Sequence, residues 1–307
     1  MKLAVPDMIS NSYFPAEAAI ELGFFKAEGL DVSLELIYPV DKAYAALRDG
    51  AIDFVGGAAH AVPSAFPGFR GVKLICAQAQ GMYWFLVMRS DLNAKRGDIG
   101  VVKGRTIGAA PWVNMGLRGL LIEAGIDPQR DQVNIAPVPG AVGSSINFGV
   151  TAAKALEDRK LDGFWANGMG AEVAVRRGVG TMVLDARRGD GPKACFNFTA
   201  ATIAATDALI ARSPETAAAA VRAIVKTLAA LRADPTRAAA VGQKLFPASE
   251  AALITDLIRR DLPYYDASLS PDFVAGMTAF ARRQGILDAE VPYESVVATQ
   301  FAPLWKG

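Results

Sequence analysis

Short apolar segments alternate along the chain with longer segments in which apolar residues recur every three or four positions. The short segments predict strands and the longer ones predict helices. Leu3–Val5 is typical of a first strand, and Pro15–Glu28 predicts a helix with its apolar side chains on one face. Alternating strands and helices are typical of parallel sheets joined by crossover helices. The pattern therefore predicts an α/β protein.

This order of elements occurs twice. The first set of predicted strands is Leu3–Val5, Val32–Ile37 and Ile52–Val55, with helices at Pro15–Glu28 and Asp41–Asp49. The second set is Thr106–Ala109, Val133–Val138 and Leu161–Trp165, with helices at Met115–Ala124 and Thr151–Asp158. Matching turn signals, such as Glu28-Gly-Leu-Asp31 and Glu123-Ala-Gly-Ile-Asp127, end the first helix of each set. We expect two lobes, each built on a βαβαβ sheet flanked by helices.

Two further strand-like segments, Met82–Met88 and Phe196–Ala204, are expected to cross between the lobes, near 82–88 and 196–204. The first lobe would then contain residues 1–85 and 197–307, and the second would contain 86–196. After the second crossing, Ser213-Pro-Glu215 predicts the capped start of a long helix that ends near Arg232. The helices that follow are expected to pack around both lobes.

The composition narrows the range of possible functions. The 32 basic and 31 acidic residues give a net charge of +1, which does not indicate a nucleic-acid partner. No apolar run reaches the roughly 18 residues of a membrane span, so no membrane insertion is expected. The chain has one histidine and two cysteines, Cys76 and Cys195, without metal-ligand spacing. We expect no metal site and no cofactor. Two buried free thiols are favoured over a disulfide.

The N-terminus leaves two possibilities open. Met1 directly precedes the first predicted strand, without the charged and apolar regions of a secretory leader. The protein would be periplasmic if a leader has been removed, and cytoplasmic if Met1 is the native start.

Several motifs carry a resemblance to a known family. Phe24-Phe25-Lys26-Ala-Glu28-Gly29-Leu-Asp31-Val and Leu47-Arg-Asp-Gly50-Ala-Ile-Asp53-Phe are similar to the N-terminal signature of the NMT1/THI5-like group. That group includes sulfonate, taurine and nitrate receptors of ABC uptake transporters, and eukaryotic synthases of the thiamine pyrimidine precursor. The resemblance covers residues 1–245. It implies a two-lobed periplasmic-binding-protein type II fold with a hinge, and a ligand cleft lined by the loops after the first and third strands of each lobe.

These loops contain small polar residues and flat aromatic side chains, which suit a small organic ligand. The candidate ligand-binding residues are Asn11, Ser12, Tyr13, Phe14, Gly57, Ala58, His60, Trp84, Trp112, Asn114, Trp165 and Asn167. For most of them a structural interpretation stays open beside the functional one. Asn114 fits a helix cap, and Trp84 fits the core.

Two interpretations of His60 stay open. A lone histidine is commonly structural, but its place after the third strand favours a position in the cleft. There it would bind an anionic ligand more tightly as the pH falls through about 6.5. The resemblance adds that the synthases carry a reacting histidine near this position, after a lysine that holds pyridoxal phosphate. Here Gly56 and Gly57 replace that lysine, so synthase chemistry is not expected.

No Ser/His/Asp set or carboxylate pair is evident, and we assign no catalytic residue. The sequence therefore predicts a monomeric receptor that binds a small organic solute, aromatic or anionic, and delivers it to an ABC permease. The alternative is a cytoplasmic enzyme on the same fold, such as a decarboxylase or a pyrimidine-precursor synthase.

Overall fold

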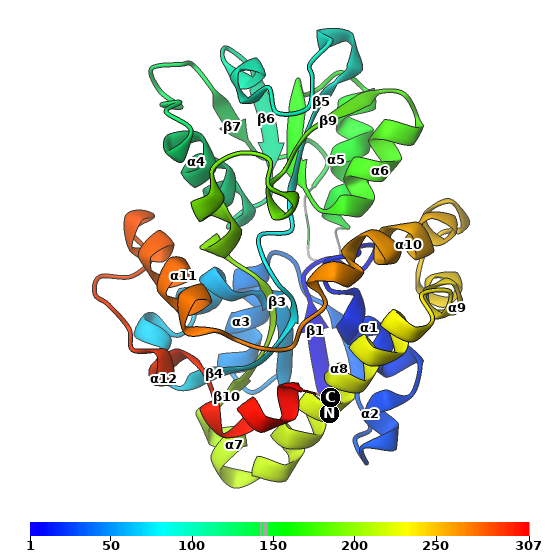
Figure 1. Ribbon diagram of the computed structural model, residues 1–307, viewed down its shortest axis with the longest axis vertical. Helices are drawn as coiled ribbons and strands as arrows, with labels where there is room; N and C mark the ends of the chain where they lie inside the picture. Colours follow the sequence, from blue (N-terminus) through cyan, green and yellow to red (C-terminus); the bar gives the residue numbers. More distant parts are fainter. Residues whose placement is uncertain (142, 144–146, 307) are drawn as a thin grey trace.

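The computed structural model describes residues 1–141, 143 and 147–306. Its backbone forms two five-stranded sheets, and each sheet is flanked by helices (Figure 1). The first sheet has the order β2-β1-β3-β10-β4, and its strands are β1 (Lys2–Val5), β2 (Ser33–Leu36), β3 (Phe54–Ala58), β4 (Val72–Ala79) and β10 (Ala201–Thr206). We call this sheet with its helices lobe I. The two-lobed α/β fold predicted from the sequence is confirmed.

Lobe II is the second sheet with its helices. The order of that sheet is β7-β6-β8-β5-β9, and its strands are β5 (Phe85–Arg89), β6 (Thr106–Ala109), β7 (Asn134–Ala136), β8 (Gly163–Ala166) and β9 (Gly180–Asp185). In each sheet the fourth strand in the order runs antiparallel to its neighbours. That strand is the one entered after a crossing, β5 after the first and β10 after the second. The two lobes therefore share one topology.

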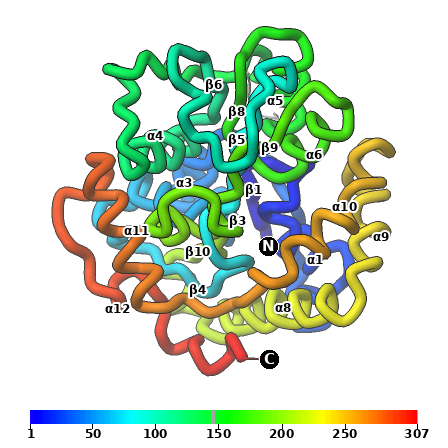
Figure 2. Tube along the Cα trace, turned by 45° about the horizontal axis from the view of Figure 1, so that its top comes forward, coloured from blue at the N-terminus to red at the C-terminus, as the bar shows by residue number. Residues whose placement is uncertain are grey.

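The helices are α1 (Phe14–Glu21), α2 (Phe24–Ala27), α3 (Val40–Arg48), α4 (Val113–Glu123), α5 (Phe148–Glu157), α6 (Gly168–Arg176), α7 (Asp207–Arg212), α8 (Pro214–Ala233), α9 (Arg237–Leu245), α10 (Ala248–Asp261), α11 (Pro271–Arg283) and α12 (Tyr293–Val296). After β10 the chain is mainly helical. Helix α8 packs on α1 and α2 of lobe I, and α10 packs on α6 of lobe II. In Figures 1 and 2, α9 and α10 lie on one side of the molecule and α11 and α12 on the other. The C-terminal helices thus contact both lobes.

Several predicted elements differ from the structure. The helix expected over Pro15–Glu28 is two helices, because Gly23 takes a left-handed conformation with φ of 79°. Ser213 stands at the N-cap of α8, but its side chain makes no capping hydrogen bond.

Less of each crossing segment forms a strand than predicted. Strand β5 begins only at Phe85, and the segment Lys193–Phe198 is a 3₁₀ helix. The two crossing segments bond to each other, since the Met82 amide donates to the Phe196 carbonyl at 2.9 Å. This bond satisfies one amide and one carbonyl of the crossings outside both sheets.

Both cysteines are buried and free, as expected. In the described part of the chain, no helix is long and apolar enough to span a membrane.

Candidate functional site

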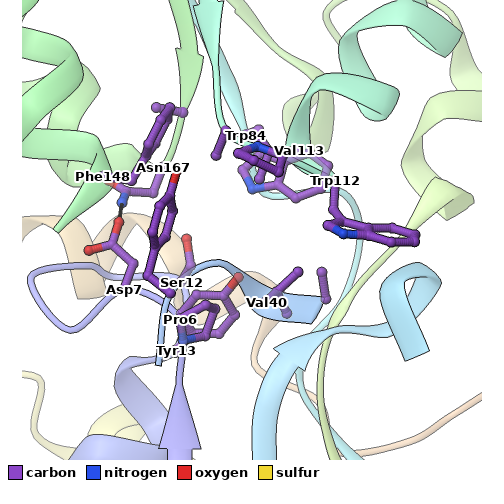
Figure 3. A pocket seen from close by; sticks show the side chains of 15 residues that line it. Pro6, Asp7, Ser12, Tyr13, Val40, Trp84, Trp112, Val113, Phe148 and Asn167 are labelled. Atoms are coloured by element: carbon purple, nitrogen blue, oxygen red, sulfur yellow. Dashed lines mark hydrogen bonds between the residues drawn. The ribbon is translucent and has the colours of Figure 1, made fainter. Parts of the chain in front are cut away.

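A cavity lies between the two lobes, and its walls come from both (Figure 3). The space not filled by atoms is about 470 Å³, which includes open solvent at the mouth of the cavity. Its lining residues are Pro6, Asp7, Ser12, Tyr13, Tyr38, Val40, Ala58, Trp84, Ala110, Pro111, Trp112, Val113, Phe148, Ala166 and Asn167. They lie mainly at the carboxyl ends of parallel strands and in the loops that follow, where ligands of open α/β sheets bind.

Aromatic rings form much of the wall. Tyr38 from lobe I stacks against Phe148 from lobe II, with ring centroids 6.2 Å apart and planes at 15°. Tyr13 lies on the floor of the cavity, and its hydroxyl is 3.1 Å from that of Tyr83. Trp84 enters from the first crossing segment. The cavity therefore offers flat apolar faces from both lobes and from the crossing.

Asp7 links the lobes at one end of the cavity. Its Oδ2 accepts a hydrogen bond from the Asn167 side-chain amide at 2.6 Å (Figure 3). It also accepts one from the Gly149 backbone amide at 3.2 Å. Gly149 lies in the first turn of α5, so the carboxyl group occupies the N-terminal end of that helix. Burial raises the pKa of Asp7 to about 8, because its charged form loses water.

A second link lies beside the first. The Oδ1 atom of Asn147 accepts from the backbone amides of Met8 and Ile9, at 3.3 and 3.1 Å. Asn147 is the N-cap residue of α5 in lobe II, whereas Met8 and Ile9 follow β1 in lobe I. The start of α5 is thus bound to one lobe I loop through both Asn147 and Gly149.

His60 does not line the cavity. It lies in a 3₁₀ helix after β3 and is fully buried, packed among Trp84, Trp112 and Phe280. Its Nδ1 is 3.0 Å from Thr199 Oγ1, and its Nε2 is 3.1 Å from the backbone carbonyl of Trp112. Burial lowers the pKa of His60 to about 4, so the ring is neutral near pH 7. The expected change of ligand binding through pH 6.5 is therefore not supported.

The bond from His60 reaches a strained part of lobe II. Trp112 precedes α4 with φ of 69°, which is unfavourable for a residue with a side chain. Its ring lines the cavity and its carbonyl receives the bond from His60. We infer that His60 supports the wall of the cavity from behind.

The structure brings together half of the predicted site residues. Those that line the cavity are Ser12, Tyr13, Ala58, Trp84, Trp112 and Asn167. The residues that lie outside it are Asn11, Phe14, Gly57, His60, Asn114 and Trp165. Asn11 instead donates to Asp261, Phe14 packs on Phe246, and Gly57 lies against Tyr44. Trp165 is buried behind Trp84, and Asn114 lies in the first turn of α4.

Sequence reasoning missed much of the lining. Asp7 lies two residues after the end of β1, a position typical of cleft residues, and this position could be read from the sequence. Tyr38 follows the second strand of its lobe, and Phe148 begins the second large helix of the other. Their contact depends on how the lobes meet, for which no local pattern exists. The Gly-rich turn before Phe148 includes Val142, Ser144, Ser145 and Ile146, which lie outside the described residues.

The chemistry available in the cavity is mainly recognition. Ser12 is buried at the wall, and its Oγ has no hydrogen-bond partner among the described residues. Across the described residues, no group of three His, Cys, Asp or Glu side chains is placed to hold a metal ion. The arrangement suits a ligand held between aromatic rings and oriented by a few polar atoms.

Residues 11–238 match the family model described as NMT1/THI5 like. That range covers most of the chain and contains both sheets apart from β1. The chain belongs to the NMT1/THI5-like family. The resemblance noted in the sequence motifs is thereby confirmed.

Individual relatives are distant. The riboflavin-binding protein RibY of Chloroflexus aurantiacus is 24% identical, over 98% of this chain and 85% of RibY. The periplasmic nitrate-binding protein NrtA of Synechocystis PCC 6803 has a TM-score of 0.71 at 14% identity, covering 99% of this chain and 86% of NrtA. The desulfurization enzyme DSZB has a TM-score of 0.64 at 16% identity, covering 98% and 97% of the two chains. These structures share the fold with this member of the family.

Proposed function

We propose that this protein is the solute-binding receptor of an ABC importer and that it closes its two lobes over one small organic molecule. The observation that carries the proposal is the cavity itself, because lobe I and lobe II both contribute its walls and bond to each other beside it. Such an arrangement is typical of hinge closure around a ligand. We place the lobe limits at 1–85 plus 197–307 and at 86–196.

The family supports this function. RibY is described as riboflavin-binding, and NrtA as a periplasmic nitrate-binding protein. By analogy, the partner of this chain would be an ABC permease, and its place would be the periplasm. The ligand would contact Ser12, Tyr13, Trp84 and Asn167, which line the cavity.

Solution scattering tests the clamp. We expect the protein without ligand to be more expanded than the structure, and saturation with riboflavin to reduce its radius of gyration. Native mass spectrometry of the freshly purified protein should detect one retained small molecule per chain. A protein that retains no molecule, and whose radius stays constant with riboflavin bound, would contradict the proposal.

An enzyme on the same fold is the second candidate, since DSZB is one. The raised pKa of Asp7, to about 8 in the cavity, favours this candidate, because catalytic acids commonly have shifted pKa values. Incubation with biphenyl-2-sulfinic acid, the molecule bound in a DSZB structure, distinguishes the two. A receptor leaves it unchanged, whereas turnover would favour the enzyme.

A further inference from the structure

The charge of the cavity bears on the class of ligand. Among the described residues that line it there is no lysine, arginine or histidine, and Asp7 is the one acidic residue. The residues outside the description are Val142, Ser144, Ser145, Ile146 and Gly307, none of which has a charged side chain. An anion in this cavity would therefore find no side-chain cation to pair with.

Helix N-termini are the other common anion sites, because their first N–H groups point outward. At α5, the Gly149 amide already donates to the Asp7 carboxyl group. At α6, the Gly170 amide donates to the side-chain oxygen of its N-cap residue, Asn167. At α1, the Ala16 amide donates to the Gln78 side chain. At each of these three helices, one of the protein's own groups thus accepts from a first-turn amide that a sulfonate or nitrate would otherwise use.

Two arginines near the cavity, the buried Arg187 and the partly exposed Arg260, form ion pairs outside it. Arg187 Nη1 lies 3.4 Å from Asp261, and Arg260 Nη1 lies 3.5 Å from Glu172. Neither arginine lines the cavity. Each arginine thus has a carboxylate partner outside the cavity, while its Nε and Nη2 atoms have no hydrogen-bond partner among the described residues.

What the cavity does offer is flat apolar surface and uncharged polar atoms. The rings of Tyr38, Phe148 and Trp84 suit a planar ring system. The Ser12 Oγ is available as donor or acceptor. We infer that the ligand is an aromatic heterocycle without negative charge, which excludes the anions named for some structural neighbours. This inference rests on the proposed receptor function.

Titration of the wild-type protein is the first test. The probes are riboflavin and lumichrome for the uncharged heterocycles, and sodium nitrate and taurine for the anionic groups. We expect the heterocycles to quench tryptophan fluorescence through Trp84, and we expect no heat from nitrate or taurine up to millimolar concentration. If nitrate or taurine binds more tightly than both heterocycles, the inference is wrong and the receptor function stands.

The second test changes the group at the start of α5. Asp7→Ala leaves the Gly149 amide and the Asn167 amide without their acceptor, so a small anion should take its place. We expect nitrate to bind this variant at least tenfold more tightly than it binds the wild type. Asp207→Ala is the matched control, because Asp207 is exposed in the first turn of α7 and follows the end of β10 opposite to Ala201, which pairs with the lining residue Ala58. Unchanged nitrate binding in Asp7→Ala would show that Asp7 is not what keeps anions out.

Failure of all four probes to bind the wild type would also overturn the inference as stated. Native mass spectrometry then distinguishes a failure of this inference from a failure of the proposed function. A retained anionic molecule would leave the receptor function standing, and a protein with no retained molecule would remove its support as well.

Discussion

His60 illustrates how a residue at a ligand-binding position can serve the structure instead. It is fully buried, and its two ring nitrogens lie within hydrogen-bond distance of Thr199 and the Trp112 carbonyl. A ligand could reach it only by displacing the aromatic rings around it. Its position after β3 was predicted correctly, but the direction of its side chain depends on packing against Phe280, from the far end of the chain.

We therefore expect His60→Ala to lower the free energy of unfolding by about 2–4 kcal/mol, because a core side chain is lost and two polar groups lose their partner. Chemical denaturation at pH 7 measures this. Since the pKa of His60 is lowered to about 4, the unfolded chain binds a proton below pH 6.5 that the folded protein does not bind until about pH 4. The stabilisation is thus present above pH 6.5 and lost as the pH falls toward 4. A ligand affinity that titrates near pH 6.5 and loses this titration in His60→Ala would contradict the structural role.

Asp7 should make lobe closure depend on pH in the direction opposite to the effect of His60 on folding stability. Its pKa is raised to about 8 where the lobes bury it, so the closed protein retains a proton that an open, solvated Asp7 would release above about 4. Closure is then most favoured below about pH 4, weakens as the pH rises from about 4 to about 8, and does not depend on Asp7 above that. We expect the affinity for riboflavin to fall between pH 5 and 8, by at most about tenfold per unit, and to level off above pH 8; Asp7→Asn should remove this slope.

The other titratable groups near Asp7 are Tyr13, Tyr38 and Glu17, and burial raises the pKa of each. The tyrosines stay uncharged below pH 9. Glu17 is the one that could add to the slope, so Glu17→Gln is the control. If Asp7→Asn retains the full slope and Glu17→Gln loses it, the assignment to Asp7 is wrong.

At the scale of elements, the contact between α5 and α6 determines the geometry at Asp7. The two helices meet at glycines, where a Cβ atom on Gly170 would lie 2.4 Å from the backbone oxygen of Gly149. A Cβ atom on Gly149 would in turn lie 2.4 Å from the Asn167 side chain. Both amides that bind Asp7 therefore depend on this close approach.

Gly170→Ala should push the helices apart and lower the free energy of unfolding by about 1–3 kcal/mol, the usual cost of overpacking. It should also weaken riboflavin binding, because the Gly149 amide moves from Asp7. Thermal and chemical denaturation measure the first effect, and calorimetry the second. Gly100→Ala is the matched control, since its nearest neighbour would lie at an ordinary 3.5 Å. Equal stability of the two variants would show that the helices have room.

Elements were predictable where local patterns define them. The strand Thr106–Ala109 was predicted with its observed bounds, and β1 within one residue. The helix break at Gly23 was missed because the apolar spacing continues across it. The start of β10 was missed because that strand depends on pairing with β3 and β4, which lie more than 100 residues away. Tyr38 and Phe148 were missed for the same reason, because each gains its role from the other lobe.

At the scale of the whole molecule, ion pairs such as Arg187–Asp261, the stack of Tyr38 on Phe148 and hydrogen bonds join the two lobes. A small set of these hydrogen bonds lies beside the cavity. They include those from Asn147 to the Met8 and Ile9 amides, the pair at Asp7, and the His60 bond to Trp112. These hydrogen bonds are short-range, so opening by a few ångströms would break them and let water replace them. A closed state held in this way suits a receptor that must release its ligand.

Asn147→Ala tests how much the bonds from Asn147 contribute to the closed state. The variant leaves the Met8 and Ile9 amides without their acceptor in the closed state only, since water satisfies them when the lobes open. We expect the affinity for riboflavin to fall about 5- to 50-fold, which corresponds to two hydrogen bonds at roughly 1 kcal/mol each. The loss should appear mainly as faster dissociation, because the bonds form after the ligand has entered. Stopped-flow fluorescence measures both rates.

Asn134→Ala is the matched control, because Asn134 is exposed on β7 of the same lobe and its side chain contacts Thr106. If Asn147→Ala instead slows association and leaves dissociation unchanged, Asn147 acts on ligand entry, and the lobes are held closed by other contacts.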